Sequence, residues 1–338
     1  MTDLSAEFKS LAEYRPVHRL RFVTAAALFD GHDASINIMR RILMGMGAEV
    51  IHLGHNRSVD EVVTAALQED AHGIAVSSYQ GGHVEFFKYM VELLRARGGE
   101  QIQVFGGGGG VIVPAEIREL QDAGVARIFS PEDGQRMGLQ GMIGEMLMRC
   151  DRDLTQGAPT EVSALQGHGD AAWRALSRLI TALENGAADA GLVKALHEGA
   201  AQLRVPVLGI TGTGGAGKSS LTDELIRRLR LDQDDSLRIA VVSIDPSRRK
   251  SGGALLGDRI RMNAIGPWQQ GSRVFMRSLA TRQAGSEISA ALPDVIAACK
   301  CAGFDLVIVE TSGIGQGDAA IVPMVDVPMY VMTPEFGA

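Results

Sequence analysis

The sequence predicts an α/β protein built from two doubly wound parallel-sheet domains. Short apolar segments alternate with amphipathic segments in two series, the first over residues 19–150 and the second beginning near residue 205. Buried strands that alternate with helices form a parallel sheet covered on both faces. The length of 338 residues also suggests two domains, at roughly 150 residues per domain. Residues 151–168 lose the periodicity, contain Gly, Pro and Thr, and are predicted to be a linker.

The first series, residues 19–150, follows a leader (residues 1–18) that is predicted to form a short polar helix. Five strand–helix units in about 130 residues suit a flavodoxin-like domain. The expected strands are Leu20–Leu28, Glu49–Leu53, Gly73–Ser77, Ile102–Phe105 and Arg127–Phe129, and the expected helices are Ser35–Met46, Val59–Glu69, Val84–Arg97, Pro114–Asp122 and Gly134–Arg149.

The second series belongs to a domain predicted over residues 169–338, and it opens with a helical lead-in, Ala171–Gln202. A helix is expected over Ser219–Leu231. The expected strands are Val205–Thr211, Arg238–Ile244, Val274–Ser278, Asp305–Glu310 and Val327–Met332. Only six residues follow the last strand, so we expect this domain to be incomplete, without a closing helix.

Composition excludes several classes of protein. The net charge is −7 and no basic patch stands out, which argues against sequence-independent nucleic-acid binding. Apolar runs such as residues 23–29 are far shorter than the ~18 residues of a membrane helix, and the N-terminus lacks an apolar signal segment. Three cysteines are too few for a disulfide framework and too poorly spaced for a zinc site. We therefore expect a cytoplasmic protein.

Residues 212–219 (GTGGAGKS) match the phosphate-loop pattern G-x-x-x-x-G-K-[ST]. The motif follows a predicted strand and opens a predicted helix, which disfavours an incidental Gly-rich turn. Its backbone N–H groups and the helix N-terminus favour an anion, Lys218 suits the β- and γ-phosphates, and Ser219 suits Mg²⁺. The predicted nucleotide-binding residues are Gly212, Gly214, Gly215, Ala216, Gly217, Lys218, Ser219 and Ser220.

Two carboxylates follow buried strands of the same series. Asp245 ends one strand, and Glu310 ends another and begins the segment ETSG, where GTPases carry D-x-x-G. The carboxyl ends of parallel strands face the ligand. We therefore predict that Lys218, Asp245 and Glu310 form the catalytic group, although a capping or solvated acid is the alternative for Glu310.

Three segments of the second domain resemble the MeaB/ArgK family, the G-protein chaperones of adenosylcobalamin-dependent mutases. They are Ala175–Gly186, Ser243–Met262 and Val309–Asp318. The resemblance implies GTP/GDP rather than ATP as the nucleotide. It also implies that Ser219, Asp245, Asp258 and Glu310 serve Mg²⁺ and the switch loops. Residues 247–257 are basic and Gly-rich, which suits a switch loop and equally a plain solvated loop.

In the first domain, Asp30-Gly31-His32 follows the first strand, at the edge where doubly wound sheets bind ligands. Asp70-Ala71-His72 has the same pattern but precedes a strand, so we interpret His72 as structural or solvated. His32 alone is most simply a loop histidine, but a carboxylate such as Asp30 is the usual partner of a metal-ligating imidazole.

Small residues end the third and fourth predicted strands, in SSYQGGH (residues 77–83) and in the run Gly106–Gly110. Small residues at adjacent strand ends leave a slot in place of a filled core. His83, the last residue of SSYQGGH, is predicted to be a surface residue or a second polar contact.

The segments DGHD, SSYQGGH and FGGGGGVI together resemble the cobalamin-binding domain of base-off/His-on B12 enzymes, although Ser35 replaces the family's Gly and Tyr79 its usual Leu. The resemblance implies that His32, held by Asp30, is the lower axial ligand of cobalt. It also implies which residues line the slot for the displaced dimethylbenzimidazole tail, namely Ser77, Tyr79, Gly106 and Gly107.

The order of the two domains resembles the fused isobutyryl-CoA mutase family, whose members continue with a substrate-binding (β/α)8 barrel. That resemblance implies radical isomerisation of isobutyryl-CoA and n-butyryl-CoA with adenosylcobalamin, Mg²⁺ and GTP/GDP, a GTP-hydrolysing domain that gates cofactor loading, and a homodimer. It also implies that this chain holds the B12 and nucleotide sites without the acyl-CoA barrel.

Two other functions stay open at this point. One is a stand-alone GTPase that carries cobalamin to a separate acyl-CoA mutase such as methylmalonyl-CoA mutase. The other is a B12-linked sensor or methyl carrier with a phosphate loop, which the MeaB-like segments disfavour. The acyl pocket would lie in the barrel, so these residues do not identify the acyl-CoA.

Overall fold

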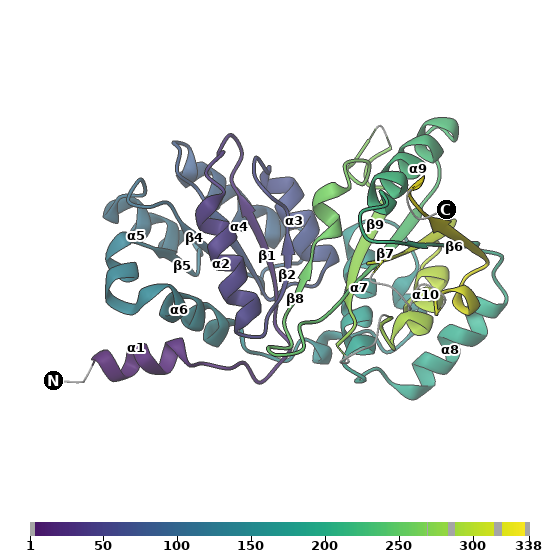
Figure 1. Ribbon diagram of the computed structural model, residues 1–338, viewed down its shortest axis with the longest axis horizontal. Helices are drawn as coiled ribbons and strands as arrows, with labels where there is room; N and C mark the ends of the chain where they lie inside the picture. Colours follow the sequence, from purple (N-terminus) through teal and green to yellow (C-terminus); the bar gives the residue numbers. More distant parts are fainter. Residues whose placement is uncertain (1–3, 269, 283–287, 314–319, 335–338) are drawn as a thin grey trace. The chain divides into compact units, whose positions relative to one another are not determined.

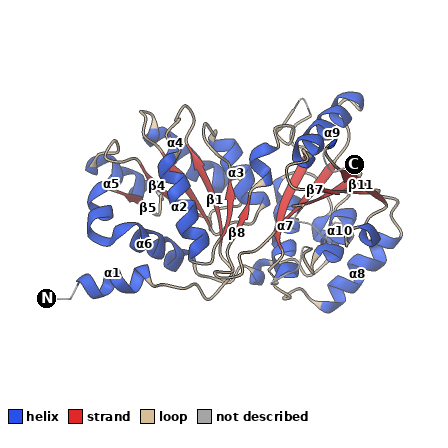
Figure 2. Ribbon diagram, in the orientation of Figure 1, coloured by secondary structure: helices blue, strands red, loops and turns tan. Residues whose placement is uncertain are grey.

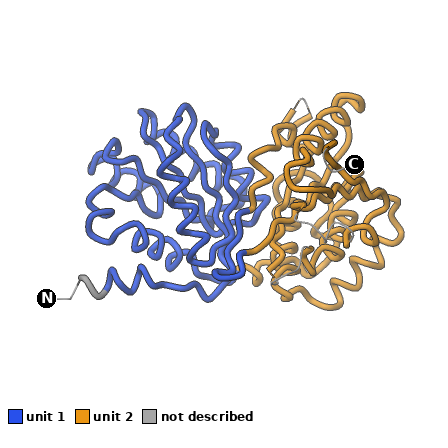
Figure 3. The backbone as a smooth tube through the Cα atoms, in the orientation of Figure 1, with its two compact units in different colours: residues 1–153, 248–255 blue, residues 154–247, 256–338 orange. Residues whose placement is uncertain are grey.

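The computed structural model describes residues 4–268, 270–282, 288–313 and 320–334. The chain divides into two compact units (Figure 3). Unit 1 comprises residues 1–153 and 248–255, and unit 2 comprises residues 154–247 and 256–338. Residues 248–255 were expected in the second domain but pack with the first unit. None of the helices in the described ranges has the length and apolar composition needed to cross a membrane.

Unit 1 is built on a sheet with the strand order β5-β4-β3-β1-β2-β8 (Figures 1 and 2). Its strands are β1 (Arg21–Ala26), β2 (Glu49–His52), β3 (Gly73–Ser77), β4 (Gln103–Gly107), β5 (Arg127–Phe129) and β8 (Ala254–Leu256). The pairs from β5 through β2 are parallel. Every residue of β1, β2 and β3 is buried, as expected for strands covered on both faces.

The first five strands have the flavodoxin-like order, which confirms the predicted fold class of this unit. The sheet order reverses between β1 and β3, because β2 lies on the far side of β1. In doubly wound sheets ligands bind outside the carboxyl ends of the strands at this point. The loops that follow Ala26 and Ser77 therefore border the expected crevice.

Helices α1 (Leu4–Ala12), α2 (Ala34–Gly45), α3 (Val59–Gln68), α4 (His83–Ala96), α5 (Pro114–Ala123) and α6 (Pro131–Cys150) complete the unit. Ser58 and Ser130 begin α3 and α6 with capping boxes, in which the serine side chain and a carboxylate three residues later satisfy free N–H groups. Helix α1 packs on α6 at Gly144, where an added Cβ would lie 1.8 Å from the Leu11 carbonyl oxygen.

Unit 2 has a parallel sheet with the order β11-β6-β10-β7-β9. Its strands are β6 (Val207–Gly212), β7 (Ile239–Asp245), β9 (Val274–Ala280), β10 (Leu306–Thr311) and β11 (Val327–Val331). Its α-helices are α7 (Asp170–Glu184), α8 (Ala190–Ala201), α9 (Lys218–Asp232) and α10 (Leu292–Cys301), and its 3₁₀ turns are Thr155–Gly157, Val162–Leu165, Asp258–Arg261 and Val322–Met324.

The helical lead-in expected over Ala171–Gln202 is present as two helices, α7 and α8. Helix α7 ends at Glu184, and Gly186 follows with φ +65°, a left-handed conformation that favours glycine and ends the helix. Helix α10 and strand β8 have no counterpart among the predicted elements. Trp173 of α7 packs on Phe275 and Phe304 in the core, with ring centroids 5.8 and 6.3 Å away.

Two buried histidines of unit 1 should make its stability depend on pH. Burial lowers the pKa of His52 and of His72 to about 4. The ring of His72 accepts a hydrogen bond from the Arg21 N–H (3.1 Å) and contacts the Arg152 carbonyl oxygen (3.2 Å), so its role is structural. In the unfolded chain the two histidines become protonated near pH 6.5, whereas in the folded chain they stay neutral down to about pH 4. Stability should therefore fall as pH drops from 6.5 towards 4, by up to about 1.4 kcal/mol per pH unit for each histidine.

Urea denaturation followed by circular dichroism at pH 7 and pH 5 measures this loss. In His72→Gln the free energy of unfolding should depend less steeply on pH, because one fewer proton is taken up on unfolding. Replacing the exposed His168 with Gln should leave this pH dependence unchanged. If the free energy of unfolding fell equally steeply with pH in His72→Gln and in the unchanged chain, the assignment of His72 as a buried neutral histidine would be contradicted.

Candidate functional site

The loop after β1 holds His32 through Asp30. The imidazole Nδ1 lies 2.9 Å from Asp30 Oδ1, and the same oxygen accepts the His32 backbone N–H at 2.8 Å. The second carboxylate oxygen accepts the Tyr79 N–H at 2.6 Å, which joins this loop to the one after β3. The His32 side chain is 76% exposed while that of Asp30 is fully buried. The ring thus has one nitrogen held by the carboxylate and its Nε2 edge available to a metal.

The charge on Asp30 is maintained by its hydrogen bonds. Burial acts to raise its pKa, but the bonds from Tyr79 and His32 outweigh burial and lower it below the usual value. An ionised carboxylate on Nδ1 fixes the tautomer of the ring and raises the basicity of Nε2. This is the arrangement expected of a metal-ligating histidine.

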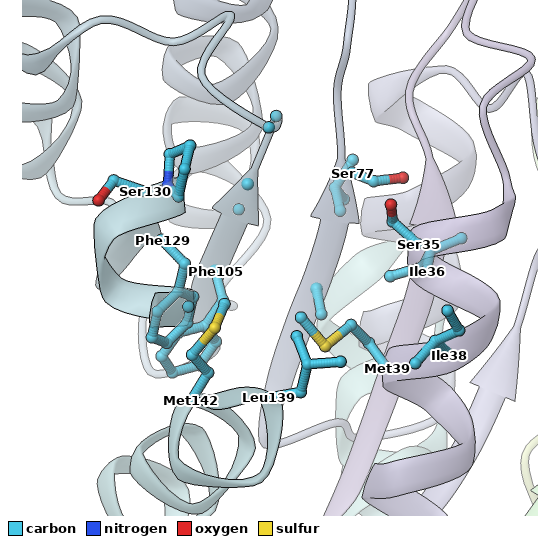
Figure 4. Close-up of a pocket in the computed structure, with 18 of the residues that line it drawn as sticks. Ser35, Ile36, Ile38, Met39, Ser77, Phe105, Phe129, Ser130, Leu139 and Met142 are labelled. Carbon is cyan, nitrogen blue, oxygen red and sulfur yellow. The ribbon is translucent and has the colours of Figure 1, made fainter. Parts of the chain in front are cut away.

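A cavity of about 310 Å³ lies beside this loop, at the carboxyl ends of β3 and β4 (Figure 4). Its upper end carries Ser35 and Ser77, and its lower end is apolar, with Met39, Leu139 and Met142. Tyr79, Gly106 and Gly107 also line it, so the structure brings the four predicted slot residues together. The apolar residues from α2 and α6 were not predicted; the apolar faces of those helices were the only signal for them.

Polar groups in the cavity fit a heterocyclic ligand with hydrogen-bonding atoms. Ser77 Oγ is buried and has no hydrogen-bond partner among the described residues. Ser35 Oγ and the Tyr79 hydroxyl lie 2.6 Å apart, so the two departures from the family pattern contact each other. A slot with an apolar floor and an unpaired hydroxyl suits the dimethylbenzimidazole tail of cobalamin.

The glycines at the end of β4 serve different purposes. A Cβ on Gly106 would lie 2.4 Å from the Phe87 ring, so this glycine admits the side chain of α4. A Cβ on Gly108 would lie 2.1 Å from the Ser78 carbonyl oxygen, so close approach of two loops requires glycine there. An added Cβ on Gly107 would meet only the Phe129 carbonyl oxygen, at 3.4 Å, so packing does not require glycine there.

His83 does not line this slot and is not a surface residue. It is buried, with Nδ1 3.0 Å from the Gln80 carbonyl oxygen and Nε2 2.9 Å from Glu116 Oε2. Burial acts to lower its pKa, but the hydrogen bonds to Gln80 and Glu116 outweigh burial and raise it. It joins the loop after β3 to α5.

The nucleotide site lies at the carboxyl ends of β6 and β10. Residues 212–217 turn between β6 and α9, with φ values of +138°, +80° and +89° at Gly212, Gly215 and Gly217. Such values require glycine and aim consecutive N–H groups inwards. Lys218 begins α9, and its Nζ donates to the Gly212 and Thr213 carbonyl oxygens at 2.9 Å each. The loop therefore has the geometry of a phosphate cradle.

Two carboxylates lie beside the serine of the phosphate loop, Ser219. Ser219 Oγ donates to Glu310 Oε1 at 2.6 Å, and Asp258 Oδ1 lies 3.4 Å from the same hydroxyl. Arg261 Nη1 lies 3.2 Å from both Ser219 Oγ and Asp258 Oδ1. Lys218, Ser219, Ser220, Asp258, Arg261 and Glu310 line a cavity of about 330 Å³. Asp245 does not line it, and Arg261, which does, was not predicted.

The carboxylates of Asp245, Asp258 and Glu310 lie close enough for the charge of one to raise the pKa of another. Burial, and then the charge of Asp258, raise the pKa of Glu310 to about 7. Burial and Asp258 likewise raise the pKa of Asp245 well above its usual value. A cation among them would relieve this repulsion.

The donor set fits Mg²⁺ better than a metal that needs a full protein cage. Within the described ranges no three His, Cys, Asp or Glu residues gather in an arrangement that could hold a metal ion. Mg²⁺ commonly takes one or two protein oxygens together with phosphate and water. Glu310 Oε2 is buried and lacks a hydrogen-bond partner among the described residues, and Ser219 Oγ lies beside Glu310. Of the MeaB-like segment 309–318, residues 314–318 lie outside the described residues.

Comparisons with known proteins match a family model to each of the two domains. Residues 20–137 match the family model described as a B12 binding domain. Residues 176–338 match the model described as methylmalonyl Co-A mutase-associated GTPase MeaB. The chain thus carries both domains that the sequence motifs predicted.

Two relatives match nearly the whole chain at high identity, and a third matches part of it. Fused isobutyryl-CoA mutase of Cupriavidus metallidurans is 74% identical over 100% of this chain and 31% of the relative. The protein of the same name from Geobacillus kaustophilus is 61% identical over 96% of this chain and 30% of the relative. GTPase ArgK of Escherichia coli is 37% identical over 35% of this chain and 34% of that protein.

The chain therefore spans about a third of the length of these curated relatives. Its two matched domains and its identity along the whole sequence show that the chain belongs to the fused isobutyryl-CoA mutase family and consists of a B12-binding domain and a MeaB-type GTPase domain.

Proposed function

We propose that this chain binds adenosylcobalamin in unit 1, with His32 as the lower axial ligand, and binds and hydrolyses Mg²⁺–GTP in unit 2. In the whole protein these sites would serve an acyl-CoA mutase that interconverts isobutyryl-CoA and n-butyryl-CoA. The observation that carries the proposal is the pairing of Asp30 and His32 beside an apolar slot that ends in the unpaired hydroxyl of Ser77.

In unit 1 the protein supplies binding, orientation and exclusion of water. Asp30 would hold Nδ1 so that Nε2 faces cobalt, and the slot would take the tail that His32 displaces. Ser77 Oγ would donate to a ring nitrogen of that tail, and the hydrogen-bonded pair of Ser35 and Tyr79 would border its upper end. Adenosylcobalamin supplies carbon-centred radical chemistry when bound, while the protein sets its position.

In unit 2 the loop N–H groups and Lys218 would bind the phosphates, and Ser219 with Glu310 would hold Mg²⁺. Asp258 contacts Ser219 from the other side and would orient it or the water shell of the metal. Hydrolysis in this site would gate cofactor loading, since a γ-phosphate and its Mg²⁺ can order neighbouring loops that relax after hydrolysis. A homodimer and a cytoplasmic location stay predictions.

Calorimetric titration of the purified chain tests the two binding functions. We expect one adenosylcobalamin and one Mg²⁺–GTP per chain, and weaker binding of ATP. Because Glu310 has a pKa of about 7, Mg²⁺–GTP binding should tighten as pH rises from 6 to 8, and this dependence should disappear in Glu310→Gln.

Mutase activity on isobutyryl-CoA is expected when the chain is joined to an acyl-CoA-binding module. If the chain instead loaded cobalamin onto a separate methylmalonyl-CoA mutase and activated it, that result would support the stand-alone carrier function over the fused mutase. Failure to bind cobalamin, or a preference for ATP, would contradict the proposal.

A further inference from the structure

His83 lies where two loops and a helix of unit 1 meet. Its ring Nδ1 is 3.0 Å from the Gln80 carbonyl oxygen in the loop after β3, and its Nε2 is 2.9 Å from Glu116 Oε2 in the first turn of α5. The side-chain amide of Gln80 donates to the Leu28 carbonyl oxygen, which belongs to the loop after β1. Directly and through Gln80, this buried ring therefore connects α5 with the loop that carries Asp30.

Both ring nitrogens of His83 face hydrogen-bond acceptors. The carbonyl oxygen of Gln80 can only accept. Glu116 Oε2 also accepts the Val113 N–H at 2.9 Å, within the capping box of α5, so it too faces the ring as an acceptor. A neutral imidazole has one N–H group and one bare nitrogen, whereas an imidazolium has two N–H groups. The doubly protonated ring is therefore the form that satisfies both contacts.

The charges around His83 favour the same form. Burial acts to lower the pKa of His83, but the hydrogen bonds to Gln80 and Glu116, together with the charges of Glu116 and Glu85, raise it above the usual value. A cavity of about 460 Å³ lies beside the ring, and from α4 the phenol of Tyr89 also lines it. The loop after β1 and helix α3 contribute only apolar residues to this cavity, namely Ala27, Leu28, Phe29 and Val59.

The loops that His83 joins border the candidate cobalamin site. In the loop after β3, Tyr79 lines the tail slot and its N–H donates to Asp30 Oδ2 at 2.6 Å. The Gly-rich loop after β4 packs on the same residue, because an added Cβ on Gly109 would lie 2.4 Å from the Tyr79 ring. This second loop ends where α5 begins, close to Glu116. The contact between His83 and Glu116 thus holds together the two loops that form the slot.

We propose that His83 is a positioning residue of the cobalamin site: as an imidazolium it holds the loops after β3 and β4 together, and so keeps the tail slot and Asp30 in the arrangement that binds the cofactor. This inference rests on the proposed function of unit 1. When His83 loses a proton, one of its two contacts becomes a bare nitrogen facing an oxygen, which favours separation of the loops. Affinity for the tail should therefore be full at pH 6 and fall as the pH rises through the pKa of His83.

The test compares adenosylcobalamin with adenosylcobinamide, which lacks the nucleotide tail, in visible-absorbance titrations of the 338-residue chain from pH 6 to pH 9. Both corrinoids would use His32, so the ratio of their dissociation constants reports the tail slot alone. In the unchanged chain the advantage of adenosylcobalamin should fall by about tenfold as the pH rises. In His83→Gln, whose side chain does not titrate, the advantage should be smaller and the same at every pH.

Two variants of α5 sharpen the result. Glu116→Gln keeps an oxygen acceptor but removes the charge beside His83, so the fall should begin at a lower pH; this variant also carries the test if His83→Gln fails to fold. Glu119→Gln is the matched control, because Glu119 pairs with Lys88 of α4 on the surface, at 2.5 Å. Its pH profile should be that of the unchanged chain.

Nitrogen-15 NMR of the chain without cofactor gives a second readout. At pH 6.5 the His83 ring should carry a proton on each nitrogen, and these signals are identified by their loss in His83→Gln. A neutral His83 ring at pH 6.5, an advantage of adenosylcobalamin that does not change with pH in the unchanged chain, or a pH dependence that persists in His83→Gln would overturn the inference. Failure of the unchanged chain to bind either corrinoid while His83 is doubly protonated would instead contradict the proposed function.

Discussion

Replacing Lys218 with alanine should lower the rate of GTP hydrolysis by about 10²–10³-fold, as removal of a charge-stabilising donor does in other enzymes. The ammonium group is the cation of the phosphate loop, and it lies within 2.9 Å of the Gly212 and Thr213 carbonyl oxygens. Without it the charge that develops on the transferring phosphoryl group loses a positive partner. Phosphate release at saturating Mg²⁺–GTP measures the effect.

Lys194→Ala is the matched control. Its side chain is 76% exposed on α8 and makes a surface ion pair with Glu198, so hydrolysis should be unchanged. Cobalamin binding should survive in Lys218→Ala, because Asp30, His32 and the slot lie in the other unit. A Lys218→Ala rate within tenfold of the unchanged chain would contradict the assignment.

Replacing Ser77 with leucine should weaken cobalamin binding by at least about a hundredfold. The new side chain would occupy the upper end of the 310 Å³ cavity and remove the unpaired hydroxyl. Ser77→Ala loses only the hydrogen bond, which corresponds to about tenfold in affinity. Comparing the two variants separates the volume of the slot from its polarity, and visible-absorbance titration gives both affinities.

Cobinamide, which has the corrin ring without the nucleotide tail, is the control ligand. It does not need the slot, so Ser77→Leu and the unchanged chain should bind it alike. Equal losses for cobalamin and cobinamide would show that Ser77 acts on the fold or the corrin rather than on the tail.

The sequence predicted the features that depend on local residues. Strands such as Gly73–Ser77 are continuous apolar runs, and the phosphate loop and the pair Asp30–His32 are motifs within a few residues. The strand order places β3 beside β4, with Ser77 paired with Gly107, which is why the four slot residues converge in the structure.

Features that depend on distant residues could not be predicted in this way. Strand β8 has three residues, and its hydrogen-bond partner Ala48 lies about two hundred positions away in the sequence. Arg261 reaches Ser219 only because the short 3₁₀ turn at Asp258 returns the chain to the phosphate loop. The apolar floor of the slot comes from α2 and α6, whose apolar side chains would suit any core position. The sequence indicated a helical segment over Ala171–Gln202 without dividing it, and the structure divides it near Gly186, where φ is +65°.

The measurement that tests the account most directly is a visible-absorbance titration of adenosylcobalamin with this chain and with His32→Ala. His168→Ala, an exposed histidine outside both sites, is the control. The account predicts a histidine-ligated spectrum for the unchanged chain and the control, and a base-off spectrum or no binding for His32→Ala. If His32→Ala gave the same bound spectrum, or if the unchanged chain left the spectrum of the cofactor unaltered, the assignment of His32 as the ligand of cobalt would be contradicted.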